Sequence, residues 1–151
     1  MTDATTPIDT PGVLAVLGFL AVLASVPLSW LRSDEAIIEV DGSLETAMRG
    51  IESGDGELLL VAVIVLGIIM AIGRWRAGRW GWLAVVPAVL AGLLTAGISL
   101  MYIIDPATGA VGDPAILEQI GAGIGLYIAL LGGILLLFAG VWGAVTGRSE
   151  D

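Results

Sequence analysis

The decapeptide GRWRAGRWGW at residues 73–82 decides how the chain is arranged. It contains three of the six basic residues and three of the five tryptophans, and it separates two long apolar runs. Arginines beside a membrane span are retained on the cytoplasmic side, and the amphipathic tryptophan ring favours the headgroup layer. The decapeptide therefore predicts a short cytoplasmic connector between two membrane helices. Six residues would act as topology anchors: Arg74, Arg76, Arg79, Trp75, Trp80 and Trp82.

The composition is that of an integral membrane protein. Of the 151 residues 57% are hydrophobic, and the mean hydropathy is +0.98, beyond what a water-soluble domain of this size needs for its core. Cysteine and histidine are absent, which excludes a disulfide, a thiol nucleophile, a Cys/His zinc site and an imidazole acid or base. We therefore expect no catalytic residue, no cofactor and no metal ligand, in a protein that is not an enzyme.

The charge balance is strongly acidic. Fifteen Asp and Glu residues face six arginines, with no lysine, for a net charge of −9. Acidic, lysine-free polar segments are typical of proteins from halophilic archaea, although a high-GC bacterial genome would also favour arginine over lysine. No nucleic-acid partner is expected, because neutralising phosphates takes a larger basic patch than three arginines beside a membrane.

Four apolar runs predict four transmembrane helices. The first, residues 13–31, is free of charges and would form about 28 Å of helix, close to one hydrocarbon thickness. A cleaved signal peptide is the alternative for this run, but the positive charges of such peptides do not precede it. The expected division is a flexible cytoplasmic tail (1–12), spans at 13–31, 58–73, 83–104 and 120–145, an acidic extracellular loop domain (32–57), the cytoplasmic connector (74–82), an extracellular turn and helix start (105–119) and a cytoplasmic tail (146–151).

The segment at 32–57 is the only polar region long enough to have structure of its own. Its β-branched residues 36–40 are followed by Asp41-Gly42, a turn signal, so a short β-hairpin fits there. Residues 43–51 could return as a strand or form a short helix, and both remain open. The expected fold class is an all-α integral membrane protein, a four-transmembrane-helix bundle with a small extracellular loop domain between helices 1 and 2.

The distribution of charge predicts the orientation. The connector and the C-terminal tail carry four arginines, whereas the opposite face carries Arg32 and Arg49 together with eleven of the fifteen acids. Basic residues accumulate on the cytoplasmic side of short loops. We therefore expect a multi-pass plasma-membrane protein with both termini in the cytoplasm and an acidic outer face.

The four apolar runs contain no ionisable Asp, Glu, Lys, Arg or His. Proton-coupled transporters usually place such groups at membrane depth, so no proton relay is expected. The polar side chains that remain are hydroxyls, which more often bond a backbone carbonyl or a neighbouring helix than line a pore. A passive pathway would have to use them: Ser25, Ser29, Thr95, Ser99, Tyr102 and Tyr127.

Small residues recur at helical spacing along the spans. Such stripes let membrane helices approach closely and gain van der Waals contact. One interpretation is that these stripes pack the four helices of the bundle against one another. The last helix has a second small-residue face, at residues 132, 136, 140 and 144. It could therefore also pack on a second copy or on another membrane protein. The helix-packing residues identified in this way are Gly121, Gly125, Ala129 and Gly133 in the last span and Ala88, Gly92 and Ala96 in the third.

The outer carboxylates could gather around Ca²⁺ or Mg²⁺, which take oxygen ligands. No EF-hand spacing is present, so a solvated acidic surface with at most weak cation binding is the favoured interpretation. The acids concerned are Asp34, Glu35, Glu39, Asp41, Asp55 and Glu57.

Several stretches resemble a group of small uncharacterised four-span membrane proteins of archaea and actinobacteria. They are Trp30 at the end of the first span, the Gly-rich passage 50–56, the Arg/Trp connector and the segment 125–133. The resemblance implies a tetraspan layout and no known activity. The outline, with a small β element between the first two helices, is also similar to the claudin-like plan, but the paired cysteines and the Gly-Leu-Trp signature of that loop are missing.

The sequence thus favours a non-enzymatic tetraspan protein that acts through assembly, as a homo-oligomer or as an accessory or structural subunit of a membrane complex. An envelope protein of a membrane-bearing virus is one version of this interpretation. The alternative is a passive channel or carrier for a small solute or ion. The expected partners are the lipid bilayer and either a second copy or another membrane protein.

Overall fold

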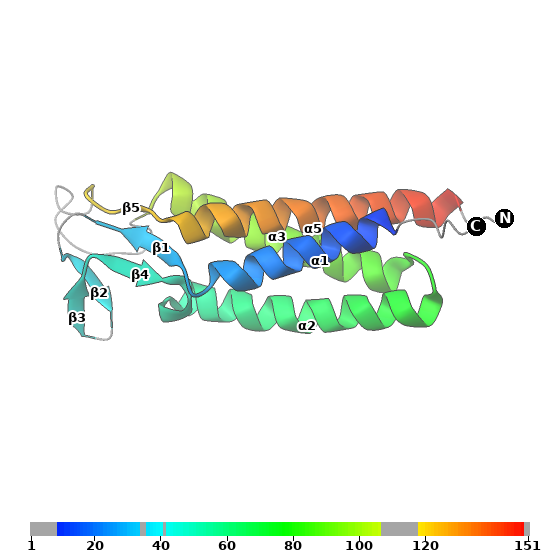
Figure 1. Cartoon of the computed structure of the whole chain (residues 1–151), viewed down its shortest axis with the longest axis horizontal. Helices are drawn as coiled ribbons and strands as arrows, with labels where there is room; N and C mark the ends of the chain where they lie inside the picture. The colour runs from blue at the N-terminus through cyan, green and yellow to red at the C-terminus, as the bar shows by residue number, and fades with distance from the viewer. Residues whose placement is uncertain (1–8, 34–35, 41, 107–117, 150–151) are drawn as a thin grey trace.

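Four helices run side by side, and short strands gather at one end of them (Figure 1). The computed structural model describes residues 9–33, 36–40, 42–106 and 118–149. Three of its helices are long and apolar enough to cross a membrane, and the first is apolar but shorter, which supports a mostly helical membrane protein. The helices are α1 (Thr10–Ser25), α2 (Gly54–Ala77), α3 (Trp82–Ile104) and α5 (Ile124–Ser149).

The strands form two small sheets. β1 (Ser29–Arg32) lies between β4 (Ala47–Arg49) and β5 (Gly121–Ala122) and is antiparallel to both. β2 (Ile38–Val40) pairs antiparallel with β3 (Ser43–Glu45). A single 3-10 turn, η1 (Gly50–Glu52), leads from β4 towards α2. We call this end of the bundle the sheet end and the opposite end, with the turn between α2 and α3, the connector end.

The helices differ from the expected spans at their ends. α1 ends at Ser25, and residues 29–32, expected as its last turn and the start of the loop, are β1 instead. Pro27 lacks the N–H for a further helical turn, and its ring crowds the preceding turn. β4 and β5 then supply the hydrogen-bonding partners for the extended chain.

The second helix is longer than the apolar run from which it was predicted. Residues 54–57, expected to separate the loop from the span, are its first turn, and residues 74–77 of the expected connector are its last. Asp55 and Glu57 lie near its N-terminus, and Arg74 and Arg76 near its C-terminus, so all four charges complement the helix dipole. Gly78 then ends the helix in the left-handed conformation (φ 66°), and its N–H donates to the carbonyl of Arg74.

The helices pack as an open row in the order α1, α5, α3, α2. α5 packs extensively on α1 and on α3, and α3 packs on α2, but α1 and α2 hardly meet. Two adjacent glycines of α5 bring its neighbours close. A Cβ at Gly132 would lie 2.7 Å from the carbonyl oxygen of Gly18 in α1, and one at Gly133 would lie 2.8 Å from the nitrogen of Ala96 in α3.

The other small residues of the expected stripes lie as follows. Ala88, Gly92 and Ala96 are buried on α3, where Gly92 faces Gly133. Ala129 is fully buried on α5, whereas Gly121 belongs to β5 and not to the helix. Both small-residue faces of α5 are therefore used inside the chain, which leaves other surfaces for any partner.

The core of the sheet end is built around the Trp30 side chain, which is fully buried. Its indole N–H donates to the carbonyl of Ser25 (3.1 Å), and its ring lies 6.1 Å from that of Tyr102. A Cβ at Gly50 would lie 2.5 Å from the indole and one at Gly125 2.8 Å from it. Only glycine leaves room for the indole at these two positions, so α1, η1 and α5 meet at one side chain.

Candidate functional site: a groove between α1 and α2

The two end helices of the row, α1 and α2, face each other across its open side. The two helices approach each other at Gly67, which is covered by the ring of Phe19, and at an ion pair between Asp9 and Arg74. Elsewhere they stand apart, and the space between them is a groove lined by both. The groove ends at a polar group, the Asp9 carboxylate.

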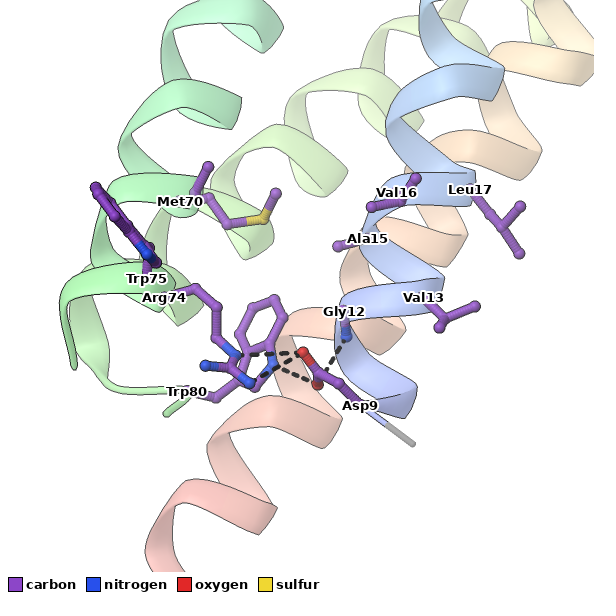
Figure 2. A pocket seen from close by; sticks show the side chains of 11 residues that line it. Asp9, Gly12, Val13, Ala15, Val16, Leu17, Met70, Arg74, Trp75 and Trp80 are labelled. Carbon is purple, nitrogen blue, oxygen red and sulfur yellow. Dashed lines mark hydrogen bonds and ion pairs between the residues drawn. The ribbon is translucent and has the colours of Figure 1, made fainter. Parts of the chain in front are cut away.

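Asp9 organises the connector end of this groove (Figure 2). Its carboxylate accepts hydrogen bonds from the backbone N–H of Gly12 (3.1 Å), the guanidinium of Arg74 (3.2 Å) and the indole N–H of Trp80 (3.0 Å). One carboxylate thus caps α1, pairs with the last turn of α2 and holds the residue that leads into α3. Each bond to the charged carboxylate is stronger than a neutral one.

The groove itself is apolar. Its wider part has a cavity volume of about 630 Å³ between Asp9 and Leu17 on α1 and between Met70 and Trp75 on α2. A second part of about 380 Å³ extends it towards Leu20 and Ile64. The two parts share Ala15, Val16, Met70 and Ala71. Polar atoms are concentrated at one end, where Asp9 and Arg74 lie.

The six expected anchors do not behave alike. Trp80 is only 6% exposed: it lies against Gly143 of α5 and donates to Asp9. A residue chosen for the headgroup layer is therefore part of the packed interior. The rings of Trp75 and Trp82 remain exposed, as headgroup anchors would, and Arg74 is held in the ion pair while Arg76 and Arg79 lie at the surface.

Asp9 is the site residue that the sequence interpretation missed, because it was assigned to the flexible tail. The signal was present, since an aspartate directly before Thr10-Pro11 is a favourable helix cap. Nothing in the sequence, however, indicates that the same carboxylate would meet Arg74 and Trp80, which lie 65 and 71 residues away.

The sheet end carries a second set of polar contacts. The hydroxyl of Tyr102 donates to the carboxylate of Asp55, which links α3 to the first turn of α2. The backbone N–H of Arg49 and then its guanidinium donate to Oε1 of Glu52 (2.9 and 3.3 Å), and these contacts lower the pKa of Glu52 below its ordinary value. Among the residues that the structure describes, no three acids come together as metal ligands would. Asp34, Glu35 and Asp41 lie outside the described residues.

The hydroxyls expected to bond within the bundle fall into two groups. Ser25 is fully buried and donates to the carbonyl of Val22 (2.6 Å). Thr95 and Ser99 are also fully buried, one turn apart on α3, and within the described chain their hydroxyls have no hydrogen-bond partner. Ser29 is in β1, and the Tyr127 ring is exposed on α5.

No known protein family and no curated protein matches this chain. The function must therefore be inferred from the helices and from the groove itself.

Proposed function

We propose that this protein is a non-enzymatic four-span membrane protein that acts through assembly, either with copies of itself or as an accessory or structural subunit of a membrane complex. Its span order would place both termini in the cytoplasm and the acidic sheet end outside. The resemblance to small tetraspan proteins agrees with this layout but suggests no activity.

The uncovered surface of α2 is the observation that carries the proposal. In its most apolar stretch 22% of the residues are buried inside the chain, against 44% in both α3 and α5. Val61, Val65, Ile69 and Ile72 are spaced four, four and three residues apart, and all are exposed. Side chains at these spacings share one helix face, and this face points away from both α3 and the groove. It offers a partner helix an uninterrupted surface along the membrane.

Lipid alone could cover this face, because lipid tails are as apolar as the side chains and exposure to them carries little penalty. What favours a protein partner is the contrast between the helices. α5 and α3, in the middle of the row, each pack on two neighbouring helices through their small residues, whereas α2, at the end of the row, packs closely on α3 alone. A second copy or a subunit on α2 would complete its packing.

Cysteine crosslinking tests the proposal directly, because the chain has no cysteine of its own. Val65→Cys on α2 should crosslink copies of the chain in its native membrane. Leu93→Cys on α3, a matched control with similar exposure, should not. Equal crosslinking at both positions would indicate random collision and would count against assembly through α2.

Native mass spectrometry of the protein extracted in mild detergent at high salt separates the two versions of the proposal. A defined homo-oligomer agrees with copies meeting at α2, and a stoichiometric second protein agrees with an accessory role. A monomer without partners, together with no crosslinking at Val65→Cys, would overturn both.

A passive channel or carrier is the second candidate, and the buried hydroxyls of Thr95 and Ser99 favour it. Two partnerless hydroxyls in the membrane interior would be satisfied by a passing water or solute. The close contact of Gly92 with Gly133 lies beside them, so a pathway would require α3 and α5 to separate. Conductance or solute flux in reconstituted bilayers that disappears in Thr95→Val would support this candidate, whereas no flux in the parent protein would exclude it.

A further inference from the structure

We propose that the groove between α1 and α2 is a binding site for one anionic phospholipid of the leaflet at the connector end, with an acyl chain between the helices and the headgroup phosphate at Arg74. This function is separate from assembly through the outer face of α2, because the two surfaces lie on different sides of that helix.

The length of the groove matches one leaflet. Its lining extends from Asp9 to Leu20 on α1 and from Trp75 back to Ile64 on α2. Eleven residue steps correspond to roughly 16 Å of helix, and half of the hydrocarbon core is about 15 Å. A chain that entered at the headgroup level would therefore reach the end of the groove near the bilayer centre.

The size of the groove fits a lipid chain better than a protein helix. The wider part, at about 630 Å³, lies within the range of about 300 to 1,000 Å³ that is usual for small-molecule sites. A helix about 10 Å across with its side chains and roughly 16 Å long would occupy about 1,300 Å³, more than the two parts of the groove together. Phe19 also fills the approach to Gly67, which denies a second helix the close backbone contact that glycine would allow.

The charges at the connector end complement a phosphate. The Asp9 carboxylate, whose side chain is 38% exposed, accepts from three donors, on Gly12, Arg74 and Trp80, which take up three of its roughly four acceptor sites. The guanidinium of Arg74 has five N–H groups in a planar fork, and the bonds to Asp9 use its Nε and Nη2. Its side chain is one-third exposed, which leaves room for a phosphate oxygen, and basic pockets between membrane helices are known to bind acidic headgroups.

Trp75 lies at the rim of the groove next to Arg74, and its ring is exposed; in Figure 2 the ring lies on the side of α2 away from α1. A tryptophan at this level has its apolar face against the chain and its N–H near the headgroup. The groove thus offers an apolar slot, an amphipathic ring and a guanidinium in the order in which a phospholipid presents its tail, glycerol and phosphate.

The test uses the full chain reconstituted in vesicles of equal parts phosphatidylglycerol and phosphatidylcholine, followed by native mass spectrometry of the lipid that remains bound. The parent protein should retain one phosphatidylglycerol per chain in preference to phosphatidylcholine. Arg74→Gln should reduce this retention about tenfold, since one charge-assisted contact is lost.

Two variants separate lipid binding from a loss of structure. Asp9→Asn also breaks the ion pair, but it retains a cap for α1 and leaves Arg74 free for the phosphate, so retention should persist or rise. If Arg74→Gln acted only by letting α1 and α2 separate, Asp9→Asn would lose the lipid equally, and that result would overturn the proposal.

The acyl chain is tested apart from the headgroup. Ala71→Phe fills the groove while the Arg74 charge is retained, and it should abolish retention. Val61→Phe places the same ring on the outer face of α2 and should have no effect. Equal retention in both variants, or equal retention of the two lipids by the parent protein, would contradict a groove that selects an anionic phospholipid.

Discussion

Trp30 shows how single residues set the geometry of the sheet end. Its indole lies where a Cβ at Gly50 would come within 2.5 Å, while Gly54, four residues further on, has open space around it. Gly50→Ala should therefore lower the stability by about 1 to 3 kcal/mol through overpacking, and Gly54→Ala should be close to neutral. Thermal unfolding in the same detergent compares the two, and equal melting temperatures would show that the indole is not held as the structure describes.

The residues around Trp30 also show how far the sequence predicts a site. Trp30, the Gly-rich passage and Gly125 stand out in the sequence, yet nothing in their spacing indicates that they meet. That contact depends on β1 pairing with β4 and β5, which joins segments about 20 and 90 residues apart. The same holds for Asp9, whose role as a cap is local and predictable but whose contact with Arg74 depends on how two helices pack.

At the scale of the element, hydropathy predicts that a helix exists better than it predicts where the helix ends. Apolar runs end at charges, but α2 extends through Asp55 and Arg74 because its end charges complement the helix dipole. α1 stops early for a different reason, since Pro27 and the pairing of β1 prevent further turns. Periodicity of small residues predicts which helix faces are in contact, but not which partner each face meets.

The pairing of α5 with α3 provides a matched test of those faces. Gly133→Leu should separate the helices, because the new side chain would meet the backbone of Ala96 and Gly92, and we expect destabilisation of about 3 kcal/mol or more. Gly97→Leu, on α3 with open space around it, should leave the melting temperature nearly unchanged. If the two variants have the same melting temperature, the contact of Gly133 with α3 contributes nothing to the stability of the bundle.

At the scale of the whole molecule, charge is segregated along the long axis. The segments that join α1 to α2 and α3 to α5, with the first turn of α2, hold eleven of the fifteen acids and two of the six arginines. Like charges repel over about 10 Å at 0.1 M salt and over about 3 Å at 1 M. The melting temperature should therefore rise between 0.1 and 1 M NaCl, and the double variant Glu45→Gln with Glu118→Gln should show a smaller rise. A melting temperature independent of salt in the parent protein would show that this repulsion is unimportant.

The arrangement of the helices makes a definite prediction for the topology, because α1 begins, α2 meets α3 and α5 ends at the same end of the bundle (Figure 1). Ala77 lies at that end and Leu44, on β3, at the other; both are exposed. In intact cells an impermeant maleimide should label Leu44→Cys but not Ala77→Cys, which should react only after permeabilisation, because arginines next to spans remain inside. The reverse labelling pattern would show that the protein has the opposite orientation in the membrane, and it would leave the helix bundle itself unchallenged. Labelling of both in intact cells would be more serious, since two ends joined by one continuous helix, α2, cannot share a side of a membrane that this helix crosses.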